Sequence, residues 1–590
     1  MKYKILNSKK QISNKEGTVK IILENRDIKT KKEIEEFLNP KLSDVNIKSV
    51  GINRVALKKA ITRIKKAIKN KEQIVVFGDY DVDGICGTAI LWETLNAIGA
   101  KVMPYIPHRI DEGYGLSQKG IRNLKLKIEN CKLIITVDNG IVANKAVDFA
   151  NKEGIDVIIT DHHVPSKKLP NAFAIVHTTK LCGTGVAWIL SETLIARGPV
   201  RSFPPASAPT KDTQVRAVGS PFSSATPRNF SHLELVALAT VADLVPLKGA
   251  NRTLLKFGLE ALRRTKRIGL LELLKEAGLE KQSIGVYEIG HMIAPRLNAM
   301  GRLEYAMDSL RLLCTNNRER AEDLARLLGS TNRERQELTL QTVLHAKDYV
   351  ESEKRKAKSE KLKSLLFVSH QTYEQGVIGL VAGKLVEEFY RPSIVVSIGE
   401  KYSKASARSI GGFNIIEFIR EHSSYLVDAG GHPMAAGFTV ETTKLTELQK
   451  KLEDRAEFVL NKDLLIRSIK IDCELPLSAI NFSLYESLQK LAPFGMGNPE
   501  PTFLSKNVSV EDVRWVGQEG KHLKLVVSSQ KSDVKLNGIA FGMGETVKIH
   551  IGDRVDIVYT IDENEWLARR SLGEGGNGEK RLQLKIKALK

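Results

Sequence analysis

The stretch that most constrains the fold is IVVFGDYDVDG, at residues 74–84. Its first four residues are apolar and predict a buried β-strand. Three carboxylates follow at alternate positions, Asp79, Asp81 and Asp83, and Gly84 then allows the backbone to turn into a helix. Carboxylates this close together repel one another unless a positive group lies among them. The stretch therefore predicts a divalent metal site at the end of a strand, with a solvated acidic turn as the alternative.

The same order of residues recurs twice further along the chain. Asp138 follows the apolar stretch LIITV, and Asp161, His162 and His163 follow the apolar stretch VIIT. Helical patterns lie between these strands, which is typical of a parallel sheet covered on both faces. Because the carboxyl ends of parallel strands meet at one edge, we expect these side chains to converge. Mixed aspartate and histidine ligands favour Mn²⁺ or a similar metal, whereas Mg²⁺ prefers oxygen ligands alone.

A further acid lies in an apolar stretch later in the chain. Residues 233–247 read LELVALATVADLVPL, which predicts a helix that contains Asp243. A carboxylate on an apolar surface is costly unless it is paired or bound to a metal. We therefore assign Asp243 as a further metal ligand, with an exposed aspartate at a helix end as the alternative.

The charge and the cysteines of the chain bound its environment and its partners. The 590 residues carry a formal charge of +21, which suits a polyanionic partner such as nucleic acid. A general lysine-rich composition with no single patch is the alternative. Five scattered cysteines lack zinc or redox spacing and suit a reducing cytoplasm. No apolar run is long enough to span a bilayer, so we expect a cytoplasmic protein that does not bind membranes.

A chain of this length needs several hydrophobic cores, and its patterning predicts a multidomain α/β protein. In chain order, we expect a peripheral N-terminal segment (1–50), a parallel-sheet catalytic domain (51–305), a linking helical region (306–360), a smaller α/β domain (361–465) and a C-terminal β-barrel (466–590). Residues 197–230 and 567–576 interrupt this pattern. Their arginine, glycine, serine and proline bias is typical of disordered insertions.

Four of the motifs occur in a fixed order, as DYDVDG, VDNG, TDHH and ADLVPL. Together they resemble the four motifs of the DHH phosphoesterase superfamily. The later stretches that narrow this resemblance to the RecJ family are APRLNAMGRL, GVIGLVAGKLVEEF, SARS, GGHPMAAGF and LAPFGMGNPEPTF. The resemblance runs from about residue 50 to the C-terminus. It implies a DHH catalytic domain, a DHH-associated nucleic-acid-binding domain over 361–465 and a C-terminal OB fold that grips single strands.

The resemblance also implies a catalytic centre with two divalent metal ions, Mn²⁺ or Mg²⁺. The expected metal ligands are Asp79, Asp81, Asp83, Asp138, His162 and Asp243. Asp138 is expected to bridge the two ions, as the family's second motif does, and Asp161 is expected to orient a histidine. His163 is expected to act on the scissile phosphate or the leaving oxygen. The full set expected to act in catalysis is Asp81, Asp83, Asp138, His162, His163 and Asp243.

Residues outside the metal motifs are expected to hold the DNA. The planar fork of arginine meets phosphate oxygens in pairs, and glycines allow backbone amides to approach a phosphate closely. The residues expected to bind DNA or phosphate are Arg109, Arg296, Ser406, Arg408, Gly430, Gly431 and His432. The barrel residues that combine aromatic and basic character, as base-stacking surfaces do, are Trp515, Lys521, His522, Lys524 and Phe541.

The implied activity is hydrolysis of single-stranded DNA from its 5′ end to mononucleotides, in DNA repair and recombination. We expect a monomer, with single-strand-binding protein and a helicase as candidate partners. Two alternatives stay open: a DHH phosphodiesterase for short oligoribonucleotides or cyclic dinucleotides, and a catalytically decayed DHH scaffold. The stretch 197–230 comes shortly before Asp243, so it must loop outward if that ligand is to reach the site.

Overall fold

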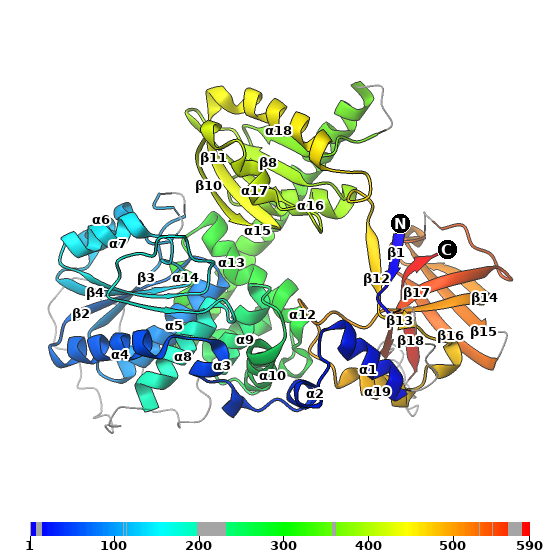
Figure 1. Cartoon of the computed structure of the whole chain (residues 1–590), viewed down its shortest axis with the longest axis horizontal. Coiled ribbons are helices and arrows are strands. Elements are labelled where there is room, and N and C mark those ends of the chain that lie inside the picture. The colour runs from blue at the N-terminus through cyan, green and yellow to red at the C-terminus, as the bar shows by residue number, and fades with distance from the viewer. Residues whose placement is uncertain are drawn as a thin grey trace. The chain divides into compact units, whose positions relative to one another are not determined.

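The computed structural model describes residues 2–7, 15–109, 111–113, 115–196, 232–356, 361–529, 532–544, 547–563 and 581–590. Both predicted insertions, 197–230 and 567–576, lie outside these residues. The chain divides into two compact units (Figure 1). Unit 1 comprises Met1–Lys41, Pro246–Arg252 and Arg467–Lys590, and unit 2 comprises Leu42–Val245 and Thr253–Ile466. Across the described helices, none combines the length and the apolar character that crossing a membrane requires.

The first sheet of unit 2 is parallel throughout, as the sequence predicts. In spatial order its strands are β3 (Val102–Tyr105), β2 (Gln73–Phe77), β4 (Cys131–Val137), β5 (Asp156–Asp161) and β6 (Ala174–His177). The central strands are continuous runs of buried isoleucine and valine because helices cover both faces. Strand β6 was not predicted. It lies at the edge of the sheet, where only alternate residues are buried.

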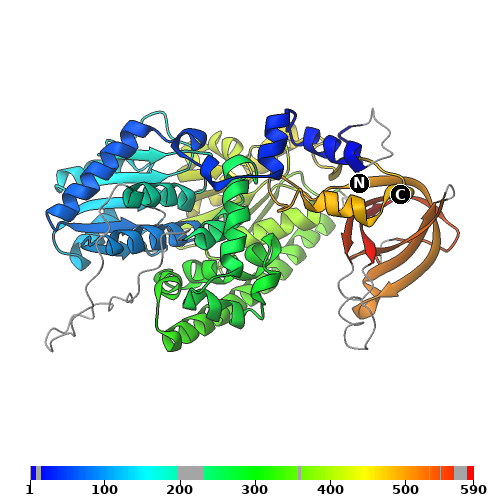
Figure 2. The same ribbon diagram turned by 90° about the horizontal axis from the view of Figure 1, so that it is seen from below.

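Helices pack on both faces of this sheet. On one face lie α4 (Arg54–Lys69), α5 (Val82–Ala97) and α8 (Gly183–Ala196), and Figure 2 looks onto this face. On the other face, α6 (Gln118–Lys127) and α7 (Asn144–Lys152) share a core with β2, β4 and β5. Helix α9 (Leu233–Ala242) packs on α5 and α8. The helix predicted over 233–247 therefore ends earlier, because Leu244 adopts a φ of 54° and Pro246 cannot continue a helix.

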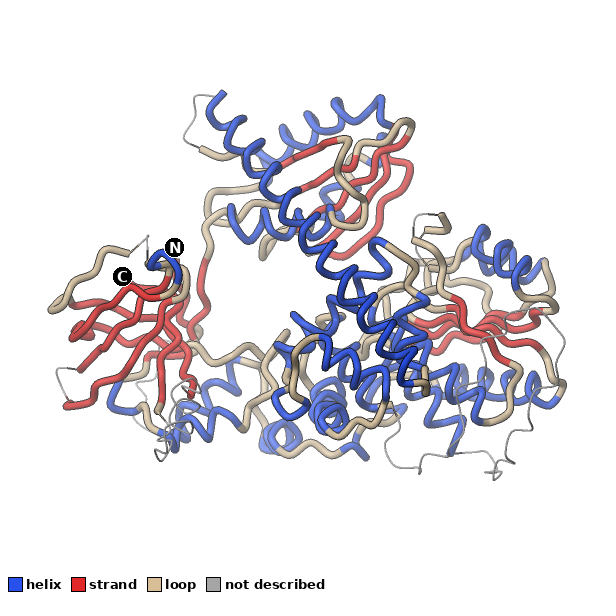
Figure 3. Tube along the Cα trace, turned by 180° about the vertical axis from the view of Figure 1, so that it is seen from behind, coloured by secondary structure: helices blue, strands red, loops and turns tan. Residues whose placement is uncertain are grey.

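A helical region joins this sheet to a second one. Its helices are α10 (Gly249–Arg263), α11 (Ile268–Glu276), α12 (Val286–Glu288), α13 (Ala294–Leu303) and α14 (Met307–Cys314). The short α3 (Ile47–Val50) lies much earlier in the chain, before the first sheet. The long blue helix in Figure 3 is α15 (Arg318–Lys356), which spans 39 residues. It packs on α11 and α13 of the first part and on α16 and β7 of the second. This confirms the predicted long linking helix.

The second sheet of unit 2 is mixed. In spatial order its strands are β10 (Leu426–His432), β11 (Ala435–Glu441), β9 (Tyr402–Arg408), β8 (Ser393–Ser397) and β7 (Leu366–His370). Only β7 and β8 pair in parallel within this sheet. Its helices are α16 (Ile378–Phe389), α17 (Ile415–Arg420) and α18 (Leu445–Val459). This is the smaller α/β domain that the sequence predicts.

Unit 1 contains the predicted C-terminal barrel. Strands β14 (Phe503–Val516), β15 (His522–Ser529), β16 (Ser532–Ala540), β18 (Leu582–Leu589) and β17 (Arg554–Glu563) pair in this order, and β17 pairs with β14 to close the barrel. Strand β14 was not predicted. It can pair on both sides because shifts in its register bend it around the barrel. The short β13 (Cys473–Glu474) pairs with β14 at the rim.

The segment predicted as peripheral, 1–50, divides between the two units: Met1–Lys41 belongs to unit 1, and the residues from Leu42 onward belong to unit 2. Strand β1 (Lys2–Ile5) pairs with β12 (Ser468–Ile471). Apolar residues of α1 (Lys15–Asn25), α2 (Lys31–Leu38) and α19 (Phe482–Gln489) share one core with the barrel. The buried guanidinium of Arg252 donates to the carbonyl of Leu491 at 2.9 Å and to that of Phe37 at 2.8 Å. These contacts connect segments that are far apart in the sequence.

Candidate active site

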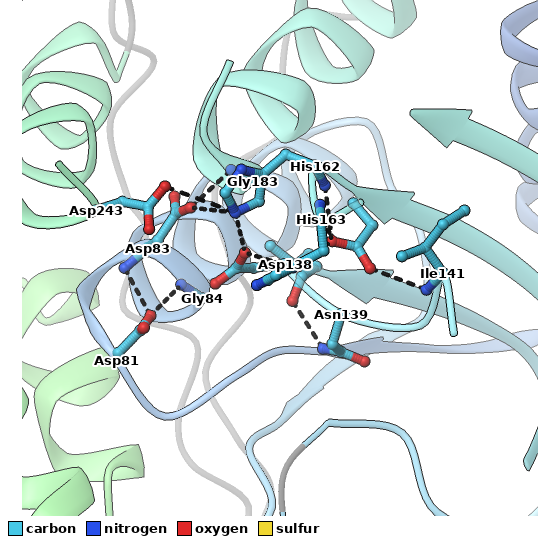
Figure 4. Close-up of polar contacts among 12 residues, drawn as sticks. Asp81, Asp83, Gly84, Asp138, Asn139, Ile141, His162, His163, Gly183 and Asp243 are labelled. Carbon is cyan, nitrogen blue, oxygen red and sulfur yellow. Dashed lines mark hydrogen bonds and ion pairs between the residues drawn. The ribbon is translucent and has the colours of Figure 1, made fainter. Parts of the chain in front are cut away.

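The carboxyl ends of β2, β4 and β5 bring the predicted motifs together at one edge of the parallel sheet (Figure 4). Possible metal ligands form three groups, each with ligand atoms within 4.8 Å of one another. The groups are Asp79 with Asp81 and Asp138, Asp83 with His162 and Asp243, and Asp138 with His162 and His163. All the predicted ligands therefore converge. Asp138 and His162 each belong to two of the groups, so the three groups form one continuous cluster.

This centre holds more negative charge than its own side chains balance. Burial raises the pKa of Asp79 well above its usual range, and the charge of Asp81 raises it further. Burial also raises the pKa of Asp138, and together with the charge of Asp83 it raises the pKa of Asp243 to about 9. Both carboxylate oxygens of Asp79 and one of Asp243 are buried with no hydrogen-bond partner among the described residues. Buried carboxylates with unused lone pairs fit divalent cations, which supply the missing positive charge.

His162 lies among the carboxylates and completes the donor set. Its Nε2 atom is 3.1 Å from an oxygen of Asp138, 3.6 Å from one of Asp243 and 3.7 Å from one of Asp83. Burial lowers the pKa of His162, which favours the neutral imidazole that a metal ligand must be. Asp243 reaches this place from the C-terminal end of α9, directly after Ala242. The last predicted ligand therefore does join the site.

Gly183, at the start of α8, was not predicted as part of the site. Its backbone N–H and that of Thr184 each donate to an oxygen of Asp83 at 2.7 Å. A Cβ atom on Gly183 would lie 2.6 Å from the Cβ of Asp138, closer than real side chains approach. Only glycine therefore fits while Asp138 keeps its position. The available signal was the pair of glycines in CGTG at 182–185, since glycine permits close backbone approach.

Asp161 and His163 form a separate pair at the edge of the carboxylate cluster. The Nδ1 atom of His163 is 2.8 Å from an oxygen of Asp161, whose other oxygen accepts the N–H of Ile141 at 2.9 Å. Burial alone would lower the pKa of His163, but the hydrogen bond and charge of Asp161 raise it to about 9. Asp161 therefore favours the protonated form of His163. The ring of His432, at the end of β10, stacks on His163 with centroids 5.7 Å apart.

A cluster of arginines lies beside the carboxylates. The guanidinium of Arg109 packs over the ring of Tyr80, 5.0 Å from its centroid. Burial lowers the pKa of Arg302 to about 10, and the charges of Arg109 and Arg408 act in the same direction. Arg302 also donates to the carbonyl of Gly376 at 3.0 Å. Arginines gathered in one buried place fit an anion such as phosphate. Arg302 was not predicted, although the motif APRLNAMGRL contains it.

The remaining residues predicted to bind DNA divide into two sets. Ser406 lies in the arginine cluster, where its hydroxyl accepts a hydrogen bond from Arg408 at 3.2 Å. Gly430 and Gly431 lie on β10 beside His432. Arg296 differs, because its guanidinium pairs with Glu276 at 2.6 Å and donates to a backbone carbonyl. A phosphate contact by Arg296 would require that ion pair to open.

Comparison with known proteins places these motifs in one family. The family model of the DHH family N-terminal domain matches residues 73–204, that of the DHHA1 domain matches 362–457, and that of the RecJ OB domain matches 471–574. The chain is 35% identical over 543 residues to the single-stranded-DNA-specific exonuclease RecJ of Bacillus subtilis, covering 90% of this chain and 63% of that protein. It is 30% identical over 566 residues to the protein of the same name from Haemophilus influenzae, covering 93% of each.

Comparison with solved structures supports the same family. The crystal structure of RecJ from Thermus thermophilus in complex with Mn²⁺ matches with a TM-score of 0.76 and 26% identity, covering 97% of this chain and 76% of that one. A crystal structure of exonuclease RecJ bound to manganese matches with a TM-score of 0.55 and 30% identity, covering 68% of this chain and 94% of that one. The motifs, the fold and the convergent acidic site lead to one conclusion: the chain belongs to the RecJ family of single-stranded-DNA-specific exonucleases.

Proposed function

We propose that this chain hydrolyses single-stranded DNA from the 5′ end and releases mononucleotides, with two divalent cations held by the convergent ligands. One observation carries the proposal: seven aspartate and histidine side chains from four separate motifs meet beside a buried arginine cluster. A phosphodiester held there would have its negative charge balanced from both sides. The proposed cellular role is DNA repair and recombination.

The ligand groups suggest how the two cations would be held. Asp138 would bridge them, because it belongs to the group of Asp79 and Asp81 and one of its oxygens lies 3.1 Å from the Nε2 atom of His162, which belongs to the group of Asp83 and Asp243. Asp79 and Asp81 would complete one site, and Asp83, Asp243 and the histidine of their group would complete the other. When bound, Mn²⁺ or Mg²⁺ would polarise the scissile phosphate and lower the pKa of an attacking water towards 7. The backbone N–H groups at the start of α8 hold Asp83 in place for this role.

His163 is the best placed proton donor of the site. Its Nδ1 atom is engaged with Asp161, and its ring stacks on His432, where it would donate to the phosphate or to the leaving oxygen. The raised pKa of His163, about 9, keeps the imidazole protonated at neutral pH. Asp161 therefore acts by orienting and charging His163 rather than as a metal ligand. His432, stacked on His163, would contact the same phosphate with Gly430 and Gly431.

The arginine cluster would recognise the 5′ end. Arg109, Arg302 and Arg408 lie beside the carboxylates and present guanidinium groups that match phosphate oxygens in pairs. A terminal phosphate carries more charge than an internal one and would be held more tightly there. A 5′ end fixed at this point, with the next phosphodiester at the cations, explains both the polarity and the mononucleotide product.

The barrel would bind the single strand as well. Trp515 and Phe541 are aromatic residues that are 50% and 60% exposed, as base-stacking residues must be. The ring of His522 packs against Phe541 with centroids 5.3 Å apart. Lys521 and Lys524 add charge for the phosphate backbone. We further propose that the protein acts as a cytoplasmic monomer and cooperates with single-strand-binding protein and a helicase.

Digestion of single strands labelled at either end tests the proposal. With Mn²⁺ or Mg²⁺ present, we expect early release of the 5′ label as a mononucleotide and no cleavage in excess chelator. Asp81→Ala should abolish cleavage while strand binding stays largely intact. Preferential loss of the 3′ label would refute the polarity. Faster turnover of dinucleotides or cyclic dinucleotides than of long DNA would instead favour a small-substrate phosphodiesterase, and inactive protein with every metal tested would favour a decayed scaffold.

A further inference from the structure

A buried ionic cluster lies away from the carboxylates of the active site. Asp83 lies at the start of α5 and Asp243 at the end of α9, and the ionic cluster lies at the opposite ends of these two helices. Its centre is Arg267, directly before α11. The Glu93 carboxylate on α5 accepts two hydrogen bonds from Arg267, at 2.6 and 3.1 Å. The Glu234 carboxylate on α9 accepts one at 3.2 Å, and the carbonyl of Leu313 accepts one at 2.7 Å. The Nδ1 atom of His232 accepts the fifth hydrogen bond, at 3.2 Å.

Every N–H of the guanidinium is therefore engaged, which is a complete use of its five donors. The four charged or titratable side chains are only 9–14% exposed. A buried ion pair of this kind contributes little net stability compared with apolar packing, but buried polar contacts can specify one arrangement among several. The catalytic proposal makes no use of this cluster, which we call the Arg267 clamp.

Helix α9 is an element whose arrangement needs such specification. Its sequence LELVALATVA is apolar on every side, and the only polar side chains within it are Glu234 and Thr240. The hydroxyl of Thr240 makes only a weak contact, 3.8 Å from the sulfur of Cys182. Packing of Leu, Val and Ala against α5 and α8 buries apolar area but hardly specifies the position of α9 along these helices, because many positions bury a similar area. The bonds from Arg267 to Glu234 and His232 supply the directional contacts.

Register matters because Asp243 lies at the far end of this helix. One residue of slip in α9 would move Asp243 by about 1.5 Å along the axis and about 100° around it. Either change would take its carboxylate away from Asp83 and His162, with which it forms one ligand group. Glu93 lies on α5, the helix that Asp81 caps at its N-terminus and that contains Asp83. The clamp thus connects the two helices whose opposite ends must meet at the site.

We infer that Arg267 is a positioning residue for the metal centre: by holding the N-terminal end of α9 on α5, it sets Asp243 opposite Asp83. The inference rests on the proposed two-cation site. It also explains how the chain can reach Asp243 in register although residues 197–230 precede α9. Loss of the clamp should weaken the cation site that uses Asp243 and spare the one formed by the other ligand group.

Calorimetric titration of the full chain with Mn²⁺ tests the inference without relying on catalysis. We expect two sites in the wild type. Arg267→Met should raise the Kd of one site about 10-fold or more and leave the other within about 2-fold, as the loss of a residue that positions a ligand does. That variant also leaves the carboxylates of Glu93 and Glu234 buried without a cation, which can unfold the protein. The deciding protein is therefore the triple variant Glu93→Leu, Glu234→Gln, Arg267→Met, which removes the buried charges together and restores apolar packing.

The outcomes separate positioning from plain stability. If the triple variant melts near the wild type and still binds one Mn²⁺ weakly, Arg267 positions Asp243. If both affinities are unchanged in it, or both fall equally, the inference is wrong. Arg63→Met is the matched control, because Arg63 is also a buried ion-paired arginine but lies at the amino ends of the strands, with Asp156. It should lower stability and change neither affinity. Asp243→Asn must itself weaken one site; if it does not, the two-cation proposal fails instead.

Discussion

Replacing Gly183 by alanine is the sharpest test of the site geometry. The new Cβ would lie 2.6 Å from the Cβ of Asp138 and 2.8 Å from its Oδ1. Ordinary contact begins at 3.4 Å, so one of the two must move by about 0.8 Å. The backbone of Gly183 is not in the left-handed region, so the clash and not backbone strain carries the effect. A shift of about 1 Å in a catalytic group can cost about 100-fold in rate.

We therefore expect Gly183→Ala to lower kcat about 100-fold, which corresponds to about 2.7 kcal/mol of activation free energy. Overpacking should also lower the free energy of unfolding by about 1–3 kcal/mol. Single-turnover digestion of 5′-labelled single strands measures the first quantity, and urea unfolding measures the second. Gly383→Ala is the control, since its Cβ would meet nothing within 4 Å and alanine favours the helix. A Gly183→Ala protein with activity within 3-fold of the wild type would refute this account of Asp138.

Three further predictions test other parts of the molecule. His163→Gln should lower kcat by about 10²–10⁴-fold with Mn²⁺ affinity nearly unchanged, because it removes a proton donor and not a ligand; calorimetry and digestion measure the two. Arg302→Gln should reduce the preference for 5′-phosphorylated over 5′-hydroxyl strands about 10-fold or more. Arg296→Gln should not, because Arg296 is paired with Glu276. An equal loss of preference in both variants would contradict phosphate binding by the arginine cluster. Mn²⁺ at 100 times its Kd should raise the free energy of unfolding by about 2.7 kcal/mol, and chelator should reverse this in thermal melts; no shift in the melts would count against the site.

Much of the active site was predictable because its signals are local. A buried parallel strand must be a continuous apolar run, and the residue after it must lie at the carboxyl edge of the sheet. Asp79, Asp138 and His162 follow such runs directly, so their convergence is a consequence of the strand pattern. The long linking helix and the barrel also follow from the periodicity of apolar residues. Strand β14 was not predicted, because its irregular register hides the alternation of apolar and polar residues.

Other features exist only as contacts between distant segments. The need for glycine at 183 comes from the position of Asp138, and the ion pair of Arg296 comes from Glu276 on another helix. The N-terminal helices belong with the barrel because their apolar faces find a core there, which no local pattern states. Arg302 and Arg267 have similar sequence surroundings to many surface arginines. The sequence by itself determined which residues could bind metal. Tertiary packing decided which arginines are placed to bind phosphate and which form ion pairs between helices, because electrostatic interactions depend on distance in space and not on separation along the chain.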